Sequence, residues 1–79
     1  MEDKFQPNRK TKQYLNNRVS KKILTLRKQL KWSQLHIATK IGMSQNNYSR
    51  IESGKSKITL DIIERICEAM EIVPVELLQ

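Results

Sequence analysis

Residues 33–54, SQLHIATKIGMSQNNYSRIESG, decide how the middle of this chain folds. Two short segments with apolar faces flank Gly42, and the second of them carries the polar block QNNYSR at residues 45–50. Tyr48 and Ile51 are expected to point inward, because they are spaced like the buried positions of one helix face. The remaining residues of the block form a polar edge that is free to contact a partner.

Charge is distributed unevenly along the 79 residues, which carry a net charge of +7. Residues 1–32 have a net charge of +8 and residues 33–57 of +3, whereas residues 58–79 have −4. A basic end and an acidic end give the molecule an oriented electrostatic surface. A run of charge is also compatible with a plain solvated surface. Next to the polar helix edge, however, it favours double-stranded DNA as the partner.

Length and composition exclude several other classes of protein. A chain of this size has room for one domain with a modest core, in which an enclosed substrate cavity is hard to fit. Its four aromatic residues are too few and too scattered for a single-strand stacking platform. We find neither a membrane-length apolar run nor a signal peptide. Because the single cysteine cannot form an internal disulfide, we expect a cytoplasmic protein.

The sequence predicts an all-α fold that begins with a flexible basic arm over residues 1–17. Apolar residues spaced three or four apart then form one helical stripe. The stripe consists of Leu15, Val19, Ile23, Leu26 and Leu30. The helix that carries it begins near Lys12 or near Asn17. We favour a helix from about 18 to 31, with the folded domain spanning residues 18–79.

Capping residues predict two short helices next. Ser33 is a suitable N-cap for a helix over 33–41, and Ser44 for a helix over 44–53. Gly42 supplies the backbone freedom that the turn between them needs, and Gly54 ends the second.

Two more helices complete the predicted set of five. Thr59 is expected to cap a fourth helix, and Pro74 suits the first turn of a short fifth helix, PVELLQ. The predicted buried face of the fourth helix consists of Leu60, Ile63, Ile66, Cys67 and Met70.

Taken together, these segments resemble the Cro/phage-repressor family, also called the xenobiotic-response-element type of helix-turn-helix DNA-binding domain. The matching text is LRKQLKWSQ, IATKIGMSQ, YSRIESGKSK, ITLDIIERICEAMEI and PVELL, within about residues 19–78. The resemblance implies a compact five-helix, lambda-repressor-like domain. It also implies that residues 33–41 lie across the DNA backbone and that residues 44–53 are the recognition helix in the major groove.

The resemblance places the base-contacting side chains at the exposed edge of the recognition helix. Gln45 and Asn46 lie near its start and Arg50 lies one turn further on, with Asn47 as a weaker candidate. The chemistry of these residues agrees with that role. Gln or Asn forms two hydrogen bonds to adenine and Arg forms two to guanine, and each such pair discriminates against the wrong base by about 1–3 kcal/mol.

A second group of residues is expected to contact phosphate and fix the position of the domain. Ser33 lies at a helix N-terminus, where phosphate is favoured. Gln34 occupies the family position that touches phosphate and braces the recognition helix. The remaining members of the group are Ser49, Lys55, Ser56 and Lys57.

Other residues are expected to be structural. The resemblance implies an ion pair between Arg27 and Glu52, and Tyr48 is expected to pack with its hydroxyl reaching the surface. Cys67 is expected to be a small buried residue. One cysteine and one histidine on separate helices make a poor nucleophile and base, so we expect no enzyme, catalytic residue, metal site or cofactor.

We therefore expect a sequence-specific regulator, most simply a repressor that binds a palindromic operator as a homodimer. Half-sites would lie about 34–36 Å apart. The apolar, acidic C-terminal region is the expected dimer surface, and the basic arm is a second candidate for contact with DNA. The sequence leaves three alternatives open: an antitoxin that binds a toxin protein, a controller protein of a restriction–modification system, and an adaptor between proteins.

Overall fold

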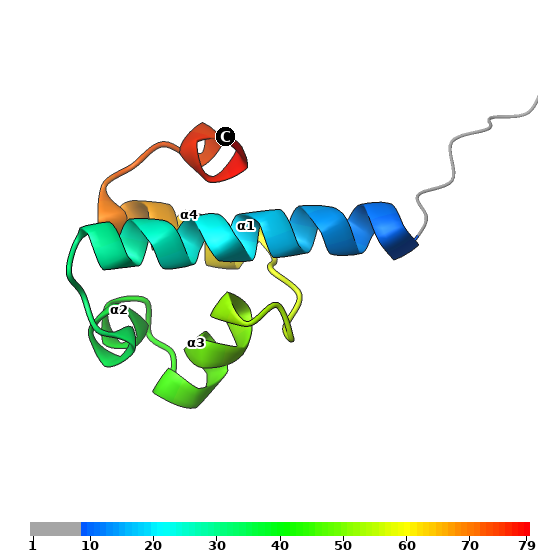
Figure 1. Ribbon diagram of the computed structural model, residues 1–79. Helices are drawn as coiled ribbons and strands as arrows, with labels where there is room; N and C mark the ends of the chain where they lie inside the picture. The colour runs from blue at the N-terminus through cyan, green and yellow to red at the C-terminus, as the bar shows by residue number, and fades with distance from the viewer. Residues whose placement is uncertain (1–8) are drawn as a thin grey trace, which may run out of the picture.

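The computed structural model describes the backbone of residues 9–79 and the side chains from Gln13 onward. Within this range there are four α-helices and a final 3₁₀ helix, and no strand. They are α1 (Arg9–Gln29), α2 (Gln34–Lys40), α3 (Gln45–Glu52), α4 (Leu60–Met70) and η1 (Pro74–Leu78) (Figure 1). The all-α prediction is confirmed for these residues. The expected fifth α-helix is a 3₁₀ helix instead, because its five residues allow little more than one turn.

The start of the first helix was predicted too late. α1 begins at Arg9, which is earlier than both predicted starts, near Lys12 or near Asn17, and earlier than the favoured start at about residue 18. Residues 9–17 of the predicted arm are therefore helical, and residues 1–8 lie outside the described residues. Between Arg9 and Tyr14 the chain has no apolar residue to show a period, yet Arg, Lys and Gln are good helix formers and no Pro or Gly interrupts them.

The other three α-helices begin at the predicted caps. The side-chain oxygens of Ser33, Ser44 and Thr59 accept hydrogen bonds from the backbone N–H three residues ahead, at 3.0, 3.1 and 3.2 Å. Each cap satisfies a backbone donor that the first helical turn leaves free. The helices 33–41 and 44–53 of the sequence prediction thus correspond to α2 and α3 with their caps.

All four α-helices end in the same backbone motif. After α1, for example, the N–H of Lys31 bonds the carbonyl of Lys28, and the N–H of Trp32 bonds that of Arg27. This Schellman arrangement requires a left-handed residue just beyond the helix. Glycine fills that place after α2 and α3. The four residues are Lys31, Gly42, Gly54 and Glu71, with φ of 61°, 74°, 80° and 57°.

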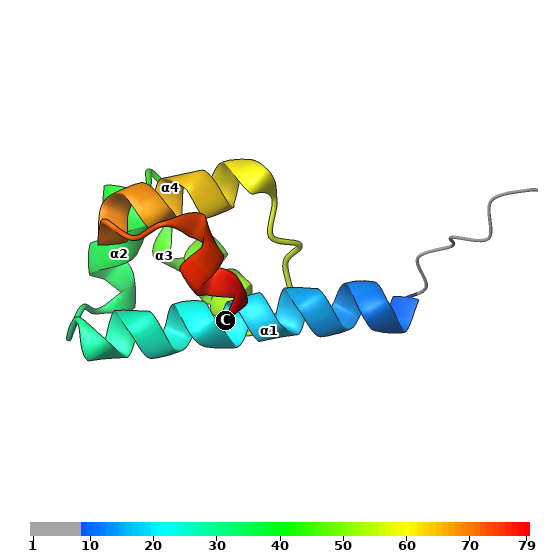
Figure 2. The same ribbon diagram turned by 90° about the horizontal axis from the view of Figure 1, so that it is seen from above.

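The helices enclose one core. α1 contacts α3 and η1, and α2 contacts α3 and α4. Figure 1 shows α2 and α3 on one side of α1 and η1 on the other. In the view from above in Figure 2, α2, α3 and α4 all lie along the same side of α1. Fully buried residues come from every element, and they include Ile23, Ile37, Tyr48, Ile66 and Leu77.

Three leucines assigned to the predicted apolar faces are exposed. Leu30 is 42% exposed, just beyond the last residue of α1. Leu15 is 51% exposed because it lies in the N-terminal half of α1, which projects past the other helices (Figure 1). Leu60 is 80% exposed because it is the first residue of α4, ahead of the turns that pack on the core.

Candidate nucleic-acid interface

The outer face of α3 is polar and free. Gln45, Asn46 and Asn47 are exposed on its first turn, and Arg50 is exposed on its last. Because residues four apart share a helix face, Asn46 and Arg50 lie side by side along it. Among the predicted reading residues, all four are therefore accessible on one short helix.

The inner face of α3 is anchored in the core. Tyr48 is completely buried and Ile51 is 2% exposed, as their spacing indicated. The tyrosine hydroxyl, which was expected to reach the surface, instead donates a hydrogen bond to Glu52 Oε2 at 2.5 Å. The expectation was wrong because the buried carboxylate of Glu52 lies one turn further along the same helix and accepts the hydrogen bond of the hydroxyl.

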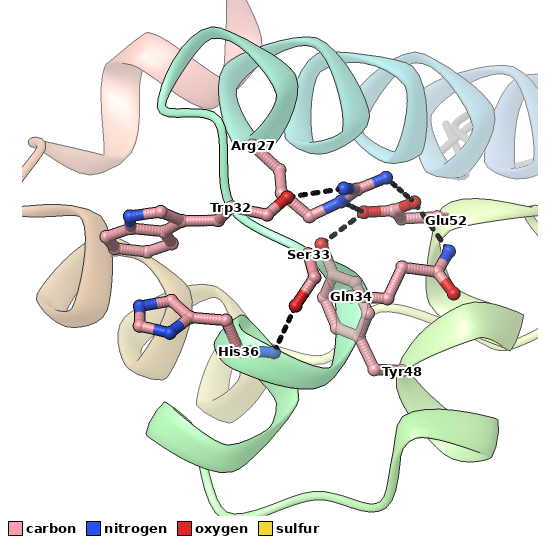
Figure 3. Close-up of polar contacts among 7 residues, drawn as sticks. All are labelled: Arg27, Trp32, Ser33, Gln34, His36, Tyr48 and Glu52. Atoms are coloured by element: carbon pink, nitrogen blue, oxygen red, sulfur yellow. Dashed lines mark hydrogen bonds and ion pairs between the residues drawn. The ribbon is translucent and has the colours of Figure 1, made fainter.

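A polar network beneath α3 joins three helices (Figure 3). Arg27 of α1 and Glu52 form the expected ion pair, with Nε 2.5 Å from Oε2 and Nη2 3.1 Å from Oε1. Arg27 Nη1 also donates to the carbonyl oxygen of Trp32 at 2.7 Å. Gln34 of α2 donates to Glu52 Oε1 at 2.9 Å. The carboxylate thus ties α1 and α2 to α3.

The network sets the protonation states of its members. Burial alone raises the pKa of the Glu52 carboxyl, but the hydrogen bonds from Arg27, Tyr48 and Gln34 hold it below its ordinary value. The hydrogen bond to Glu52 raises the pKa of the Arg27 guanidinium against the effect of burial. Burial and then Glu52 raise the pKa of the Tyr48 phenol. At neutral pH the pair is charged and the tyrosine is neutral.

The predicted phosphate-contacting residues occupy three places. Ser33 is exposed at the start of α2, and half-buried Gln34 follows it. In the loop after α3, Lys55 and Lys57 are exposed and Ser56 is half-buried. The sixth member, Ser49, is half-buried on α3. The loop of residues 55–57 is held against the C-terminus of α3, because the N–H groups of Lys55 and Ser56 both donate to the Arg50 carbonyl, at 2.9 and 3.1 Å.

One residue of this region escaped the sequence analysis. Asn16 of α1 bonds the loop at two points, donating from Nδ2 to the Ser56 carbonyl at 3.1 Å and accepting at Oδ1 from the Ile58 N–H at 2.8 Å. No local pattern signals this contact, because about forty residues separate the partners along the chain.

Charge in the structure follows the division seen in the sequence. The exposed cations Arg50, Lys55 and Lys57 lie on α3 and its following loop. The acidic residues beyond residue 57 belong to α4, its C-cap and η1; they are Asp61, Glu64, Glu68, Glu71 and Glu76. The polar face of α3 is thus on the basic part of the molecule.

Two further observations concern residues 9–79. None of the helices there combines the length and the apolar character needed to cross a membrane. In the same described part of the chain, no three His, Cys, Asp or Glu side chains are grouped to hold a metal ion.

Comparison with known proteins gives matches in sequence and in structure. The family model described as helix-turn-helix, HTH_3, matches residues 23–78. Antitoxin PezA of Streptococcus pneumoniae serotype 4 is 34% identical over 59 residues, which are 75% of this chain and 37% of that protein. The chain therefore spans little more than a third of the length of this relative.

Solved structures share the fold. The restriction-modification controller protein C.AhdI from Aeromonas hydrophila superposes with a TM-score of 0.74 and 24% identity, covering 77% of this chain and 92% of its own. The hypothetical transcription factor NHTF from Neisseria gives 0.77 and 24%, with 96% and 82% coverage. The clp gene regulator ClgR from C. glutamicum gives 0.78 and 16%, with 81% and 83% coverage.

Proposed function

This chain belongs to the helix-turn-helix family, and we propose that it is a sequence-specific regulator that binds double-stranded DNA through α3. One observation carries the proposal. The buried Glu52 of α3 is bonded to Arg27 of α1 and to Gln34 of α2, while the outer face of α3 presents only polar side chains. A rigidly held polar helix edge can match the donors and acceptors of base pairs in the major groove.

The side chains on that edge suit base recognition. An asparagine or glutamine amide bonds the N6 and N7 edge of adenine, and an arginine guanidinium bonds O6 and N7 of guanine. Asn46 and Arg50 lie one turn apart on the same face, so we propose that they contact neighbouring base pairs. Gln45 and Asn47 on the first turn are the other proposed base contacts.

The surrounding residues are proposed to hold the phosphate backbone. Gln34 uses one amide N–H on Glu52 and keeps a second N–H for a phosphate oxygen. Exposed Lys55 and Lys57 supply positive charge beside α3, and contacts of this kind position a protein without reading sequence. Ser33, Ser49 and Ser56 complete the proposed set.

We further propose that two copies bind together through the C-terminal region. Of its apolar residues, Met70 and Leu77 are buried in the core, whereas Val73, Val75 and Leu78 are each more than half exposed. Val73 is the N-cap of η1, and Val75 and Leu78 belong to it. This 3₁₀ helix lies on the other side of α1 from α3 (Figure 1), so pairing there leaves α3 uncovered. Two copies on a palindrome would then repress transcription by occupying an operator.

Selection from random duplex DNA tests the function. The wild type should enrich one motif with two-fold symmetry, and a variant with Gln45, Asn46 and Arg50 all replaced by alanine should enrich none. A control variant with Thr25, Gln29 and Glu64 replaced by alanine changes three exposed positions outside the predicted arm and the proposed interface, and it should select the wild-type motif. Enrichment of the same motif by both variants would contradict the proposal.

The likeness to an antitoxin favours a second candidate function, in which this chain also binds a protein partner. Coexpression with the product of the adjacent gene, followed by size-exclusion chromatography, tests it. A stable complex that still binds the selected DNA would support the second function. Separate elution of the two proteins at micromolar concentration would count against it.

A further inference from the structure

We propose that Asn16 is a positioning residue for DNA binding, which holds the loop of Lys55 to Lys57 in the conformation that contacts phosphate. The inference rests on the proposed function, since it concerns how the same interface is built. It assigns a role to the N-terminal half of α1, a segment that lies before the first residue of the helix-turn-helix match.

The contact is made by both polar atoms of one side chain. The Asn16 amide donates to the Ser56 carbonyl at 3.1 Å and accepts from the Ile58 N–H at 2.8 Å. These two backbone groups belong to the residues on either side of Lys57. One partly buried amide therefore fixes the backbone immediately before and after an exposed cation.

The two halves of the loop are held by different elements. The first half is bound to the end of α3, where the N–H groups of Lys55 and Ser56 share the Arg50 carbonyl. The second half is bound to α1 through Asn16. Lys55 is thus positioned by the helix that precedes it, whereas Lys57 depends on a contact from a distant part of the chain.

Asn17 brings α1 close to the same segment. A Cβ atom added at Gly54 would lie 2.7 Å from Asn17 Oδ1, and Gly54 has a φ of +80°. Glycine at this position therefore allows both the left-handed turn and the close approach of α1. Asn16 thus bonds the end of the loop, while the neighbouring Asn17 lies close to Gly54 just before its start.

The alternative is that Asn16 serves only the stability of the fold. The two roles differ in what they do to binding. A positioning role predicts that Asn16 and Lys57 act on the same phosphate contact. Removing either should then weaken binding about tenfold, as the loss of one charge-assisted contact does, and should lower the slope of log K against log salt by about 1.

The test compares the full chain with Asn16→Ala, Lys57→Ala and the double variant on the selected duplex across a salt series. Thr25→Ala is the matched control, because Thr25 is exposed on α1 and lies outside both the predicted arm and the proposed interface. We expect each single variant to bind about tenfold more weakly and the double variant to be little weaker than either. Wild-type affinity of Asn16→Ala, or additive losses in the double variant, would overturn the proposal.

Amide hydrogen exchange without DNA separates this proposal from the function it rests on. In Asn16→Ala the Ile58 N–H should exchange faster, while buried residues such as Ile66 keep their protection. Loss of protection throughout the core would overturn the proposal, because Asn16 would then serve the whole fold. If the wild type selects no duplex, the proposed function fails and the positioning role fails with it. If the wild type selects a duplex and Asn16→Ala binds it as tightly, only the positioning role fails.

Discussion

Replacing Glu52 with alanine should destabilise the protein by about 3–5 kcal/mol, the usual cost of leaving one charge of a buried ion pair without its partner. The Glu52 side chain accepts hydrogen bonds from Arg27 Nε and Nη2, the Tyr48 hydroxyl and the Gln34 amide. Arg27 would keep only its bond to the Trp32 carbonyl, and its side chain is 11% exposed. Water can therefore replace the lost carboxylate only in part.

Urea unfolding followed by circular dichroism measures this cost. All variants are compared at one protein concentration, because pairing of copies would make stability depend on it. Glu64→Ala is the control: Glu64 is an exposed glutamate on α4, and its loss should change the free energy of unfolding by no more than about 0.5 kcal/mol. A loss below about 1 kcal/mol in Glu52→Ala would refute the role given to the network.

A double replacement distinguishes the unpaired charge from other effects. Combining Arg27→Met with Glu52→Leu removes both charges and leaves apolar side chains of similar length in place. Buried pairs replaced in this way often cost little, so the double variant should be more stable than Glu52→Ala. A double variant that is less stable would show that the hydrogen-bond geometry, rather than the unpaired charge, dominates.

Three smaller predictions follow from individual residues. The pKa of Glu52 is lowered in the folded state, so its contribution to stability is present above its ordinary pKa of 4.5 and is lost as the pH falls through the folded value; Glu52→Gln should show a flatter decline in acid. Ser20 is 2% exposed, and its hydroxyl has no hydrogen-bond partner among the described residues. Ser20→Ala should therefore raise the free energy of unfolding in urea by about 0.5–1 kcal/mol. A lower free energy of unfolding would mean that the hydroxyl is hydrogen-bonded. Glu71 has a φ of 57° at the end of α4, so Glu71→Gly should raise the free energy of unfolding by about 0.5–1 kcal/mol, and an unchanged value would show that its left-handed backbone is not strained.

The sequence predicted best what depends on local chemistry. Ser33, Ser44 and Thr59 cap helices through their own side chains, and Gly42 supplies a left-handed turn, so a few neighbouring residues reveal each feature. The Arg27–Glu52 pair came from the family resemblance. The accessibility of the polar edge of α3 followed from the spacing of Tyr48 and Ile51 alone.

The features that the sequence did not predict depend on distant contacts or on weak local signals. The first turn of α1 has no apolar residue from which a helical period could be predicted. Lys31 has a left-handed backbone, which a glycine at that position would have indicated but a lysine does not. The Tyr48 hydroxyl is buried because its partner is itself held by α1 and α2. Asn16 looks like any polar residue of a helix until its loop partners are placed beside it.

The central claim is that α3 reads base pairs while the loop after it holds phosphate. Base-preference profiles of Arg50→Ala and Lys55→Ala, measured on a library of single-base operator variants, test it most directly. Arg50→Ala should lose its preference at one position in each half-site, at a cost of about 1–3 kcal/mol for the preferred base, whereas Lys55→Ala should weaken all sequences about equally. A uniform loss in Arg50→Ala, with every base preference retained, would contradict the account.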